Sequence, residues 1–313
     1  MNTATRSCAH AIFAIASRYS ISRRNSACNE DRVVILPRTD QKHRDVADHY
    51  DDLSHWYLQI WGEHVHHGFW ETGSESVDLA VVQLTQRVAQ ETSIRAGATV
   101  VDIGCGYGAT SRLLAKGYGA RVTGFTLSKA QYEYAITRGE DPANPDIRCQ
   151  DWFENDLPDA SVDVAISIES SEHMEDKPRF FSEVQRVLKP GGRFAICAWI
   201  ARDTPKSWEV DYLLEPICRE GRLPSMGDER DYTRWFEDAG FTDIRFQDFT
   251  RNVKRTWFLI IGRMAKRMLW DKEAWRFLFT GPNTIFGLTV LRMAIAYNTG
   301  SLRYGLFTAT KPN

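Results

Sequence analysis

The stretch "SIESSEHMED", Ser167 to Asp176, places one imidazole among four carboxylates within ten residues. An unperturbed histidine has a pKa of about 6.5, which suits a general base that works near neutral pH. We therefore expect His173 to take a proton from a nucleophile, and Glu169 to orient that nucleophile or to stabilise positive charge. We expect Glu172 and Glu175 to lie on a solvated face.

A glycine-rich turn marks a second place for chemistry, in "VVDIGCGYGATSRLLA", Val100 to Ala115. A short apolar strand runs into Gly104 and Gly106 and then into an apolar helix. Together with Ala109, these glycines match the loose pattern G-x-G-x-x-G/A, in which amides at a helix N-terminus meet a nucleotide. The pattern alone leaves a nicotinamide or flavin dinucleotide as one candidate ligand.

Asp102 favours a different ligand. It lies two residues before Gly104, at the carboxyl end of the strand, where we expect its carboxylate to face the ligand. A carboxylate there repels a pyrophosphate and attracts the ammonium of an amino acid. The next strand ends in "VTGFTLS", with Phe125 and Thr126 where a dinucleotide enzyme has the acid that binds ribose. A ligand that joins a nucleoside to an amino acid is S-adenosylmethionine.

A pair of residues that follows the third expected strand also supports S-adenosylmethionine as the ligand. Asp151 and Trp152 follow that strand in "QDWFENDLP". A carboxylate can accept a hydrogen bond from the amino group of adenine, and an indole can pack on the face of the ring. The set favours S-adenosylmethionine, and an NAD-dependent oxidoreductase stays open as the alternative.

The elements that must position these residues alternate between strand and helix patterns. After helices that start at residue 44 and span 77–90, we expect strands at 99–103, 121–125, 147–149, 162–167 and 193–199, separated by helices at 109–116, 129–138 and 178–188. Such alternation predicts right-handed crossovers and a mainly parallel sheet. Further along we expect an insertion at 208–223, helices at 230–239, 253–270 and 283–298, and strands at 241–249 and from 302.

Composition narrows the class of protein. The 313 residues carry a formal net charge of −2, so there is no broad basic field that would attract nucleic acid. The six cysteines form no C-x-x-C pair, so we expect neither a metal site nor a disulfide framework. No apolar run approaches the length of about 18 residues that spans a bilayer. The composition of residues 1–43 predicts a disordered or leader segment, and the alternative is a mistaken start of the reading frame. We expect a cytoplasmic protein, and targeting to an organelle stays open as the alternative.

The region from Tyr50 to Trp199 resembles a known family. Its motifs are "YDDLSHWYLQIWGEHVHHGFW", "VVDIGCGYG", "VTGFTLSKAQ" and "LPDASVDVAISIESSEHMEDKPRFFSEVQRVLKPGG". They resemble, in the same order, those of class I S-adenosylmethionine-dependent methyltransferases. Within that class the match is to the branch of γ-tocopherol O-methyltransferases, with cyclopropane-fatty-acid synthases and sterol C-methyltransferases as cousins.

The resemblance implies a Rossmann-like α/β fold, with a mainly parallel seven-stranded sheet, helices on both faces and an α-helical cap. It implies a methyltransferase domain over 44–313, with a helical lid at 44–95 and an acceptor-binding cap at 200–300. The lid includes Tyr50 and the loop His66–Gly68, which fold over the methionine end of the cofactor. Cofactor contacts are implied for Tyr50, His67, Asp102, Gly104, Gly106, Thr126, Leu127, Gln131, Asp151, Trp152 and Ile168, with His173 and Glu169 in the active site.

The activity expected from the resemblance is methyl transfer from S-adenosylmethionine to a hydrophobic small molecule, at the oxygen of a prenylated phenol or quinol. Two alternatives stay open: methyl or methylene addition to an alkene carbon, and a binding protein that has lost turnover. The basic amphipathic segment "VKRTWFLIIGRMAKRMLW", Val253 to Trp270, predicts either a membrane-surface element or a cap helix with snorkelling side chains.

Overall fold

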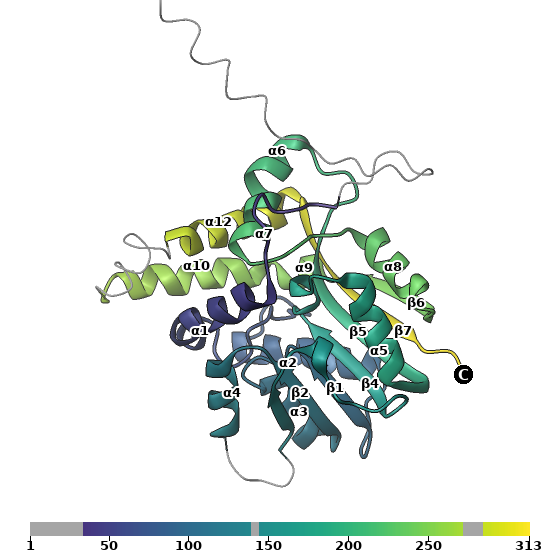
Figure 1. The fold of residues 1–313 in the computed structure, drawn as a ribbon. Helices are drawn as coiled ribbons and strands as arrows, with labels where there is room; N and C mark the ends of the chain where they lie inside the picture. The colour runs from purple at the N-terminus through teal and green to yellow at the C-terminus, as the bar shows by residue number, and fades with distance from the viewer. Residues whose placement is uncertain (1–33, 139–143, 272–283) are drawn as a thin grey trace, which may run out of the picture. The chain divides into compact units, whose positions relative to one another are not determined.

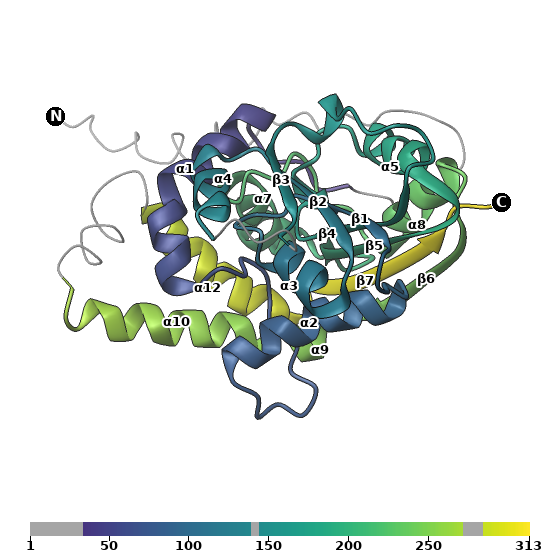
Figure 2. The same cartoon turned by 90° about the horizontal axis from the view of Figure 1, so that it is seen from below.

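Seven strands form one sheet in the computed structural model, which describes residues 34–138, 144–271 and 284–313. The strands are β1 (Thr99–Ile103), β2 (Arg121–Thr126), β3 (Asp146–Cys149), β4 (Val162–Ile168), β5 (Leu188–Ala201), β6 (Thr242–Asp248) and β7 (Leu302–Thr310). They lie in the order β3-β2-β1-β4-β5-β7-β6, which can be followed from Figures 1 and 2 together. The pairs from β3 to β5 are parallel, and β7 runs antiparallel to both β5 and β6. The strand order reverses beside β1, which is where open α/β sheets bind ligands.

Helices cover both faces of the sheet (Figures 1 and 2). They are α1 (His43–Ile60), α2 (Val77–Glu91), α3 (Ala109–Tyr118), α4 (Lys129–Ile136), α5 (Lys177–Val187), α6 (Ser207–Glu209), α7 (Glu215–Glu220), α8 (Glu229–Asp238), α9 (Thr250–Val253), α10 (Arg255–Met268) and α12 (Thr284–Thr299). A π-helix, η3 (Val210–Leu214), joins α6 to α7, and single 3-10 turns follow β3 (η1, Trp152–Glu154) and β4 (η2, Ser171–His173). Among the described helices, none combines the length and apolar character needed to cross a membrane.

Two hydrophobic cores lie on the two sides of the sheet. Successive residues of a strand point to opposite faces, and in β1 Val100 belongs to one core and Val101 to the other. The first core packs α2, α3, α10 and α12 on the sheet, and the second packs α5 and α8. Strands buried on both faces are typical of a doubly wound sheet. The predicted fold class is therefore confirmed.

Most predicted elements occur within one or two residues of their expected bounds, with two differences. The "KPGG" segment, Lys189 to Gly192, lies inside β5, where the register with β4 slips between Val162 and Val164. The single helix expected over 253–270 is divided into α9 and α10. The first turn, α9, is fixed by Asp248 Oδ1, which accepts from the Thr250 amide at 2.8 Å.

The N-terminal boundary and the lid also differ from expectation. Ile35 is buried and exchanges two backbone hydrogen bonds with Met226, so the packed chain begins before residue 44. Residues 1–33 of the predicted leader lie outside the described residues. Helix α2 packs beside α3 in the sheet's core, so it covers the sheet rather than the ligand pocket. Of the predicted lid, α1 and the loop after it contribute Val46, Tyr50 and Val65 to the lining of the ligand pocket.

Candidate active site

A pocket lies at the carboxyl ends of β1 to β4, beside the reversal of strand order. Its walls come from the loop after β1 (Gly104, Gly106), from the segments after β2 and β3 (Thr126, Leu127, Ser128, Gln131, Gln150, Asp151, Trp152), from the loop after β4 (Ile168, Glu169, Ser170, His173, Met174), from α1 (Val46, Tyr50), and from Val65, Ile103 and Phe125. Nine of the eleven predicted cofactor residues and both predicted catalytic residues line it.

The glycine loop forms the floor of the pocket. Gly104 and Gly106 have φ values of +78° and +55°, which side chains rarely allow. A Cβ on Gly104 would lie 2.2 Å from Ser170 Cβ, so the loops after β1 and β4 meet here without a side chain between them. The amides of Gly104 and Cys105 both donate to Phe125 O, at 2.9 and 2.8 Å. These bonds fix the loop, and Gly104 and Gly106 line the pocket without a side chain.

Asp102 does not line this pocket, contrary to the expectation that its carboxylate faces the ligand. The side chain is 2% exposed, and its Oδ2 accepts from Ser111 Oγ at 2.6 Å. Burial raises its pKa to about 6, against the lowering effect of the Ser111 hydrogen bond. Asp102 thus joins the end of β1 to α3 from behind the glycine loop. The spacing predicted its position on the strand but not the direction of its side chain.

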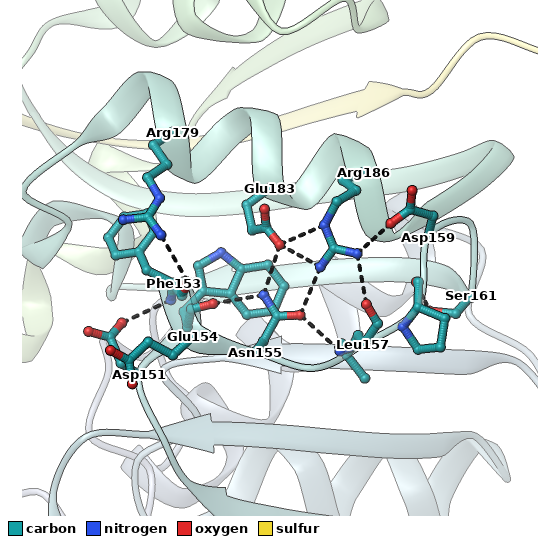
Figure 3. A network of polar contacts seen from close by, with 12 residues as sticks. Asp151, Phe153, Glu154, Asn155, Leu157, Asp159, Ser161, Arg179, Glu183 and Arg186 are labelled. Atoms are coloured by element: carbon teal, nitrogen blue, oxygen red, sulfur yellow. Dashed lines mark hydrogen bonds and ion pairs between the residues drawn. The ribbon is translucent and has the colours of Figure 1, made fainter.

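The loop after β3 is held in place by a network of polar contacts (Figure 3). Asp151 Oδ1 accepts from the Phe153 amide at 2.9 Å, and Asn155 Nδ2 donates to Trp152 O at 2.8 Å. From α5, Arg179 Nη2 donates to Phe153 O at 3.0 Å, and Glu183 Oε1 accepts from Asn155 Nδ2 at 3.1 Å (Figure 3). These contacts fix Asp151 and Trp152 at the rim of the pocket.

The pocket fits S-adenosylmethionine in the chemistry that it offers. The two glycines leave a cradle for a nucleoside and its amino-acid tail. Trp152 is 2% exposed, and its indole Nε1–H has no hydrogen-bond partner among the described residues, which a bound ligand or water would supply. No group of three His, Cys, Asp or Glu within the described ranges is arranged to hold a metal ion.

Helix α1 is attached to the cofactor side of the pocket. Asp51 Oδ1 accepts from Ser128 Oγ and, at 3.0 Å, from the Ala130 amide, at the N-terminus of α4. Thr126 Oγ1 donates to Gln131 Oε1 at 2.7 Å within the same corner. The next residue to Asp51, Tyr50, therefore projects over the pocket from a fixed helix.

His173 lies at the acceptor side with both ring nitrogens engaged. Nδ1 lies 3.2 Å from Arg222 O, and Nε2 lies 3.1 Å from the Tyr50 hydroxyl. A carbonyl can only accept, so Nδ1 carries the proton and Nε2 accepts from Tyr50. Burial lowers the pKa of His173 to about 4, so the ring is neutral at pH 7 and is a weaker base than the ordinary value of about 6.5 had led us to expect. In this tautomer the Nε2 lone pair is directed at the Tyr50 hydroxyl, and both residues line the pocket.

Glu169 is the centre of a buried network that the sequence did not reveal. Its Oε1 accepts from the His67 amide (2.7 Å) and the Tyr304 hydroxyl (2.8 Å), and its Oε2 accepts from His67 Nδ1 and Trp199 Nε1, both at 2.9 Å. Although burial opposes ionisation, the electrostatic interaction with His67 and the hydrogen bonds from it lower the pKa of Glu169 to about 2. The residue has a left-handed backbone (φ +54°), a strained conformation that this network holds in place.

His67 serves this network rather than the pocket wall. Its Nδ1 donates to Glu169 and its Nε2 accepts from Trp257 Nε1 at 2.7 Å, so both nitrogens have protein partners. The side chain is 2% exposed and does not line the pocket. The expected direct contact of His67 with the cofactor is therefore not seen. Within the loop around His66 and Gly68, the residue that lines the pocket is Val65.

Glu172 was expected on a solvated face and is instead buried, at 3% exposure. Its carboxylate accepts from the Trp199 amide at 2.7 Å and from Ser171 Oγ at 3.1 Å. Burial raises its pKa to about 7, with a smaller contribution from the charge of Glu169. Nearby Lys177 is also buried, and burial lowers its pKa to about 8. Glu175 is exposed, as predicted.

The site residues that the sequence analysis missed belong to the site because of contacts between elements that are distant in the sequence. Ser170 accommodates the close approach of Gly104, while Tyr304, Trp199 and Trp257 converge on Glu169 and His67 from β7, β5 and α10. The only sequence signal for them was the high aromatic content of 12%. That signal indicated an aromatic surrounding without naming its members.

Comparison with known proteins agrees with this geometry. Residues 37–268 match the family model of mycolic acid cyclopropane synthetase. The chain is 34% identical over 286 residues to a probable chloroplastic tocopherol O-methyltransferase of Oryza sativa subsp. japonica, covering 85% of this chain and 78% of that protein. It is 32% identical over 302 residues to the tocopherol O-methyltransferase of Arabidopsis thaliana, covering 88% and 84%.

A solved structure shares the fold. The crystal structure of the mycolic acid cyclopropane synthase CmaA1, complexed with S-adenosylhomocysteine and CTAB, superposes with a TM-score of 0.77 at 20% identity, covering 87% of this chain and 99% of that one. The chain belongs to the mycolic acid cyclopropane synthetase family and is an S-adenosylmethionine-dependent methyltransferase.

Proposed function

We propose that the enzyme transfers a methyl group from S-adenosylmethionine to the hydroxyl oxygen of a hydrophobic phenol or quinol with a prenyl-type side chain. The observation that carries the proposal is the neutral imidazole of His173 at the pocket wall, with its Nε2 lone pair directed at the Tyr50 hydroxyl. A phenol oxygen is a far better nucleophile once its proton is held by such a base.

His173 is oriented for this task from behind. The Nδ1–H bond to Arg222 O fixes the tautomer and the plane of the ring. The Tyr50 hydroxyl occupies the Nε2 lone pair, so an acceptor hydroxyl reaches the base by replacing Tyr50 or by passing its proton through the Tyr50 oxygen. Burial raises the pKa of Tyr50 well above its ordinary value, so Tyr50 acts as a neutral donor.

The rest of the catalysis is positioning and exclusion of water. S-Adenosylmethionine, when bound, supplies a methyl group that is already activated on a sulfonium. Holding two reactants in line can lower a barrier by roughly 7–11 kcal/mol. Here α1, fixed by Asp51, and the buried loop of His66 and His67 enclose the pocket. Glu169, ionised and saturated with donors, supplies a fixed negative charge at the wall without taking a proton.

The apolar part of the wall supports a hydrophobic acceptor. Val46, Val65, Ile168 and Met174 lie beside His173 in the pocket lining. Both plant relatives are named for tocopherol, a lipophilic phenol. The alternative is methyl or methylene addition to an alkene carbon, and it is supported by the family model's name and by the anionic Glu169, which can stabilise a developing positive charge.

The test is a product analysis with the purified full-length chain. The chain is incubated with S-adenosylmethionine carrying a labelled methyl group and, separately, with a prenylated hydroquinone, an unprenylated hydroquinone and an unsaturated fatty acyl lipid. The proposal expects label in the prenylated hydroquinone, released by ether-cleaving reagents. Label that survives ether cleavage establishes carbon methylation, and label in the acyl lipid alone establishes the alkene alternative; either result overturns the proposal.

A further inference from the structure

Apolar side chains gather on the outer surface of α10 and α12. Of the eleven large hydrophobic residues that are exposed in the described chain, six lie on these helices or at the end of α10. We define them as the α10–α12 face: Phe258, Leu269, Trp270, Leu288, Leu291 and Ile295. Leu269 and Trp270 are 75% and 86% exposed, the two highest values of the eleven. Hydrophobic residues scattered singly need no explanation, but a cluster on adjoining helices does.

The spacing shows that each helix is apolar on two sides. In α10, Trp257, Ile260 and Met264 are buried in the core, while Phe258 and Leu269, the residue after the helix, are exposed eleven residues apart, which is about three turns. In α12, Val290 and Met293 are buried, while Leu288, Leu291 and Ile295 are exposed at intervals of three and four. A surface helix of a water-facing domain has a polar outer side. These two helices carry large apolar residues on the outer side as well.

The same surface is strongly basic. Between Thr250 and Trp270 there are six basic residues and no acidic one, in a chain with a formal net charge of −2: Arg251, Lys254, Arg255, Arg263, Lys266 and Arg267. Arg267 is partly neutralised by Asp271, at 3.0 Å. Arg251, Arg255, Arg263 and Lys266 are exposed. Basic residues beside exposed leucine and tryptophan are typical of surfaces that insert into the interface of an anionic membrane.

From this combination we infer that the α10–α12 face docks on the surface of an anionic lipid bilayer. Charge complementarity decides between this partner and a second copy of the chain, because a symmetric dimer would place the six basic residues of one copy against those of the other. Nucleic acid fits less well, since its phosphates would not cover the exposed leucines and tryptophan.

The inner side of α10 connects this face to the active site. Thr256 Oγ1 accepts from the Gly68 amide at 3.1 Å, and Trp257 Nε1 donates to His67 Nε2 at 2.7 Å. Arg263 Nη1 donates to Ile60 O, at the end of α1, at 2.7 Å. α1, α10 and α12 lie together at one side of the sheet in both views (Figures 1 and 2). Docking therefore brings the wall formed by α1 next to the bilayer in which a lipophilic acceptor dissolves.

The experiment is vesicle flotation with the full-length chain, in the absence of S-adenosylmethionine and acceptor, so its outcome is independent of the proposed acceptor chemistry. Vesicles of phosphatidylcholine with phosphatidylglycerol are compared with phosphatidylcholine alone. We expect binding to the anionic vesicles only, weakening as salt rises. Each basic residue near an anionic surface contributes about fivefold to binding, so Lys254→Glu with Lys266→Glu should weaken it at least ~20-fold. Leu269→Ser with Trp270→Ser should weaken it by more than ~10-fold.

Matched controls change exposed residues elsewhere. Leu79→Ser with Ile136→Ser removes exposed apolar residues (47% and 52%) from α2 and α4, and Lys116→Glu reverses a charge on α3. These controls should bind like the natural chain, and all variants should unfold at a similar temperature. Equal binding by the face variants and the controls, absence of vesicle binding, or a dimer in sedimentation that the face variants abolish would each overturn the inference.

Discussion

The two halves of the pocket are built by different means. The cofactor half consists of the segments after β1, β2 and β3, where glycines with positive φ, helix caps and backbone hydrogen bonds set the shape. The acceptor half consists of α1 and the loop after β4, where side chains from distant elements meet, such as Glu169 with His67 and Tyr304. The cofactor half depends on local conformation and the acceptor half on long-range packing. Substitutions in the two halves should therefore have different effects on cofactor binding and on turnover.

Gly104→Ala should have the largest effect, because it distorts the cofactor half at the point where the loop after β1 meets Ser170. The new Cβ would lie 2.2 Å from Ser170 Cβ, and the φ of +78° adds strain. We expect S-adenosylmethionine binding to become undetectable in calorimetry, with a lower melting temperature. Gly240→Ala is the control, because Gly240 has a similar φ of +83° with no atom near its Cβ. It should cost about 1 kcal/mol and leave binding intact. Equal binding losses would contradict a steric role for Gly104.

His173→Ala should break the acceptor half and spare the cofactor half. Loss of a general base typically lowers turnover by about 10²–10⁴-fold. Affinity for S-adenosylmethionine should change by less than about twofold, because the cofactor half keeps its own contacts. Added imidazole should restore part of the activity, which a merely structural histidine would not allow. Tyr50→Phe removes the hydroxyl on Nε2 and should cost about tenfold. Normal turnover by His173→Ala, measured with labelled cofactor, would show that the base is elsewhere.

Glu169 and Glu172 should make the stability of the fold depend on pH in opposite ways, although they are three residues apart. Burial raises the pKa of Glu172 to about 7, so the folded protein binds that proton more tightly than the unfolded chain, and its contribution to stability falls as pH rises from about 4.5 through about 7. The pKa of Glu169 is lowered to about 2, so its contribution is lost only as pH falls below about 4.5.

Glu172→Gln should remove the neutral-pH part of this dependence. The variant should gain stability over the natural chain as pH rises, by roughly 3 kcal/mol between pH 4.5 and 8. Denaturant unfolding at several pH values measures the difference. Glu169→Gln is the contrasting variant: an amide group would oppose one of the donors now facing the carboxylate, so it should lose stability at every pH above 4.5. Parallel pH profiles for Glu172→Gln and the natural chain would contradict the buried carboxyl.

The sequence predicted the cofactor half because its signals are local. A strand, two glycines and a helix start are neighbours in the chain, and a parallel sheet brings the ends of successive strands to one edge. The burial of Glu172 and the network of Glu169 could not be predicted, because their partners Trp199, Tyr304 and Trp257 are 27 to 190 residues distant from the residues that they contact. Periodicity identifies a helix or strand, but it does not identify which side chains meet across the fold.

Asp102→Asn should have the smallest effect, and it tests a carboxylate that was expected to touch the cofactor. In the structure Asp102 is buried behind the glycine loop, and an asparagine oxygen could still accept from Ser111 Oγ. If the residue acts by holding the loop, affinity for S-adenosylmethionine should fall about tenfold or less, and equally for S-adenosylhomocysteine and for an analogue that lacks the amino group. If its charge attracts the ammonium, the loss should be much larger and should disappear for the analogue without the amine. Calorimetry with the three ligands separates the two cases, because only a direct electrostatic role makes the penalty depend on the ligand's charge.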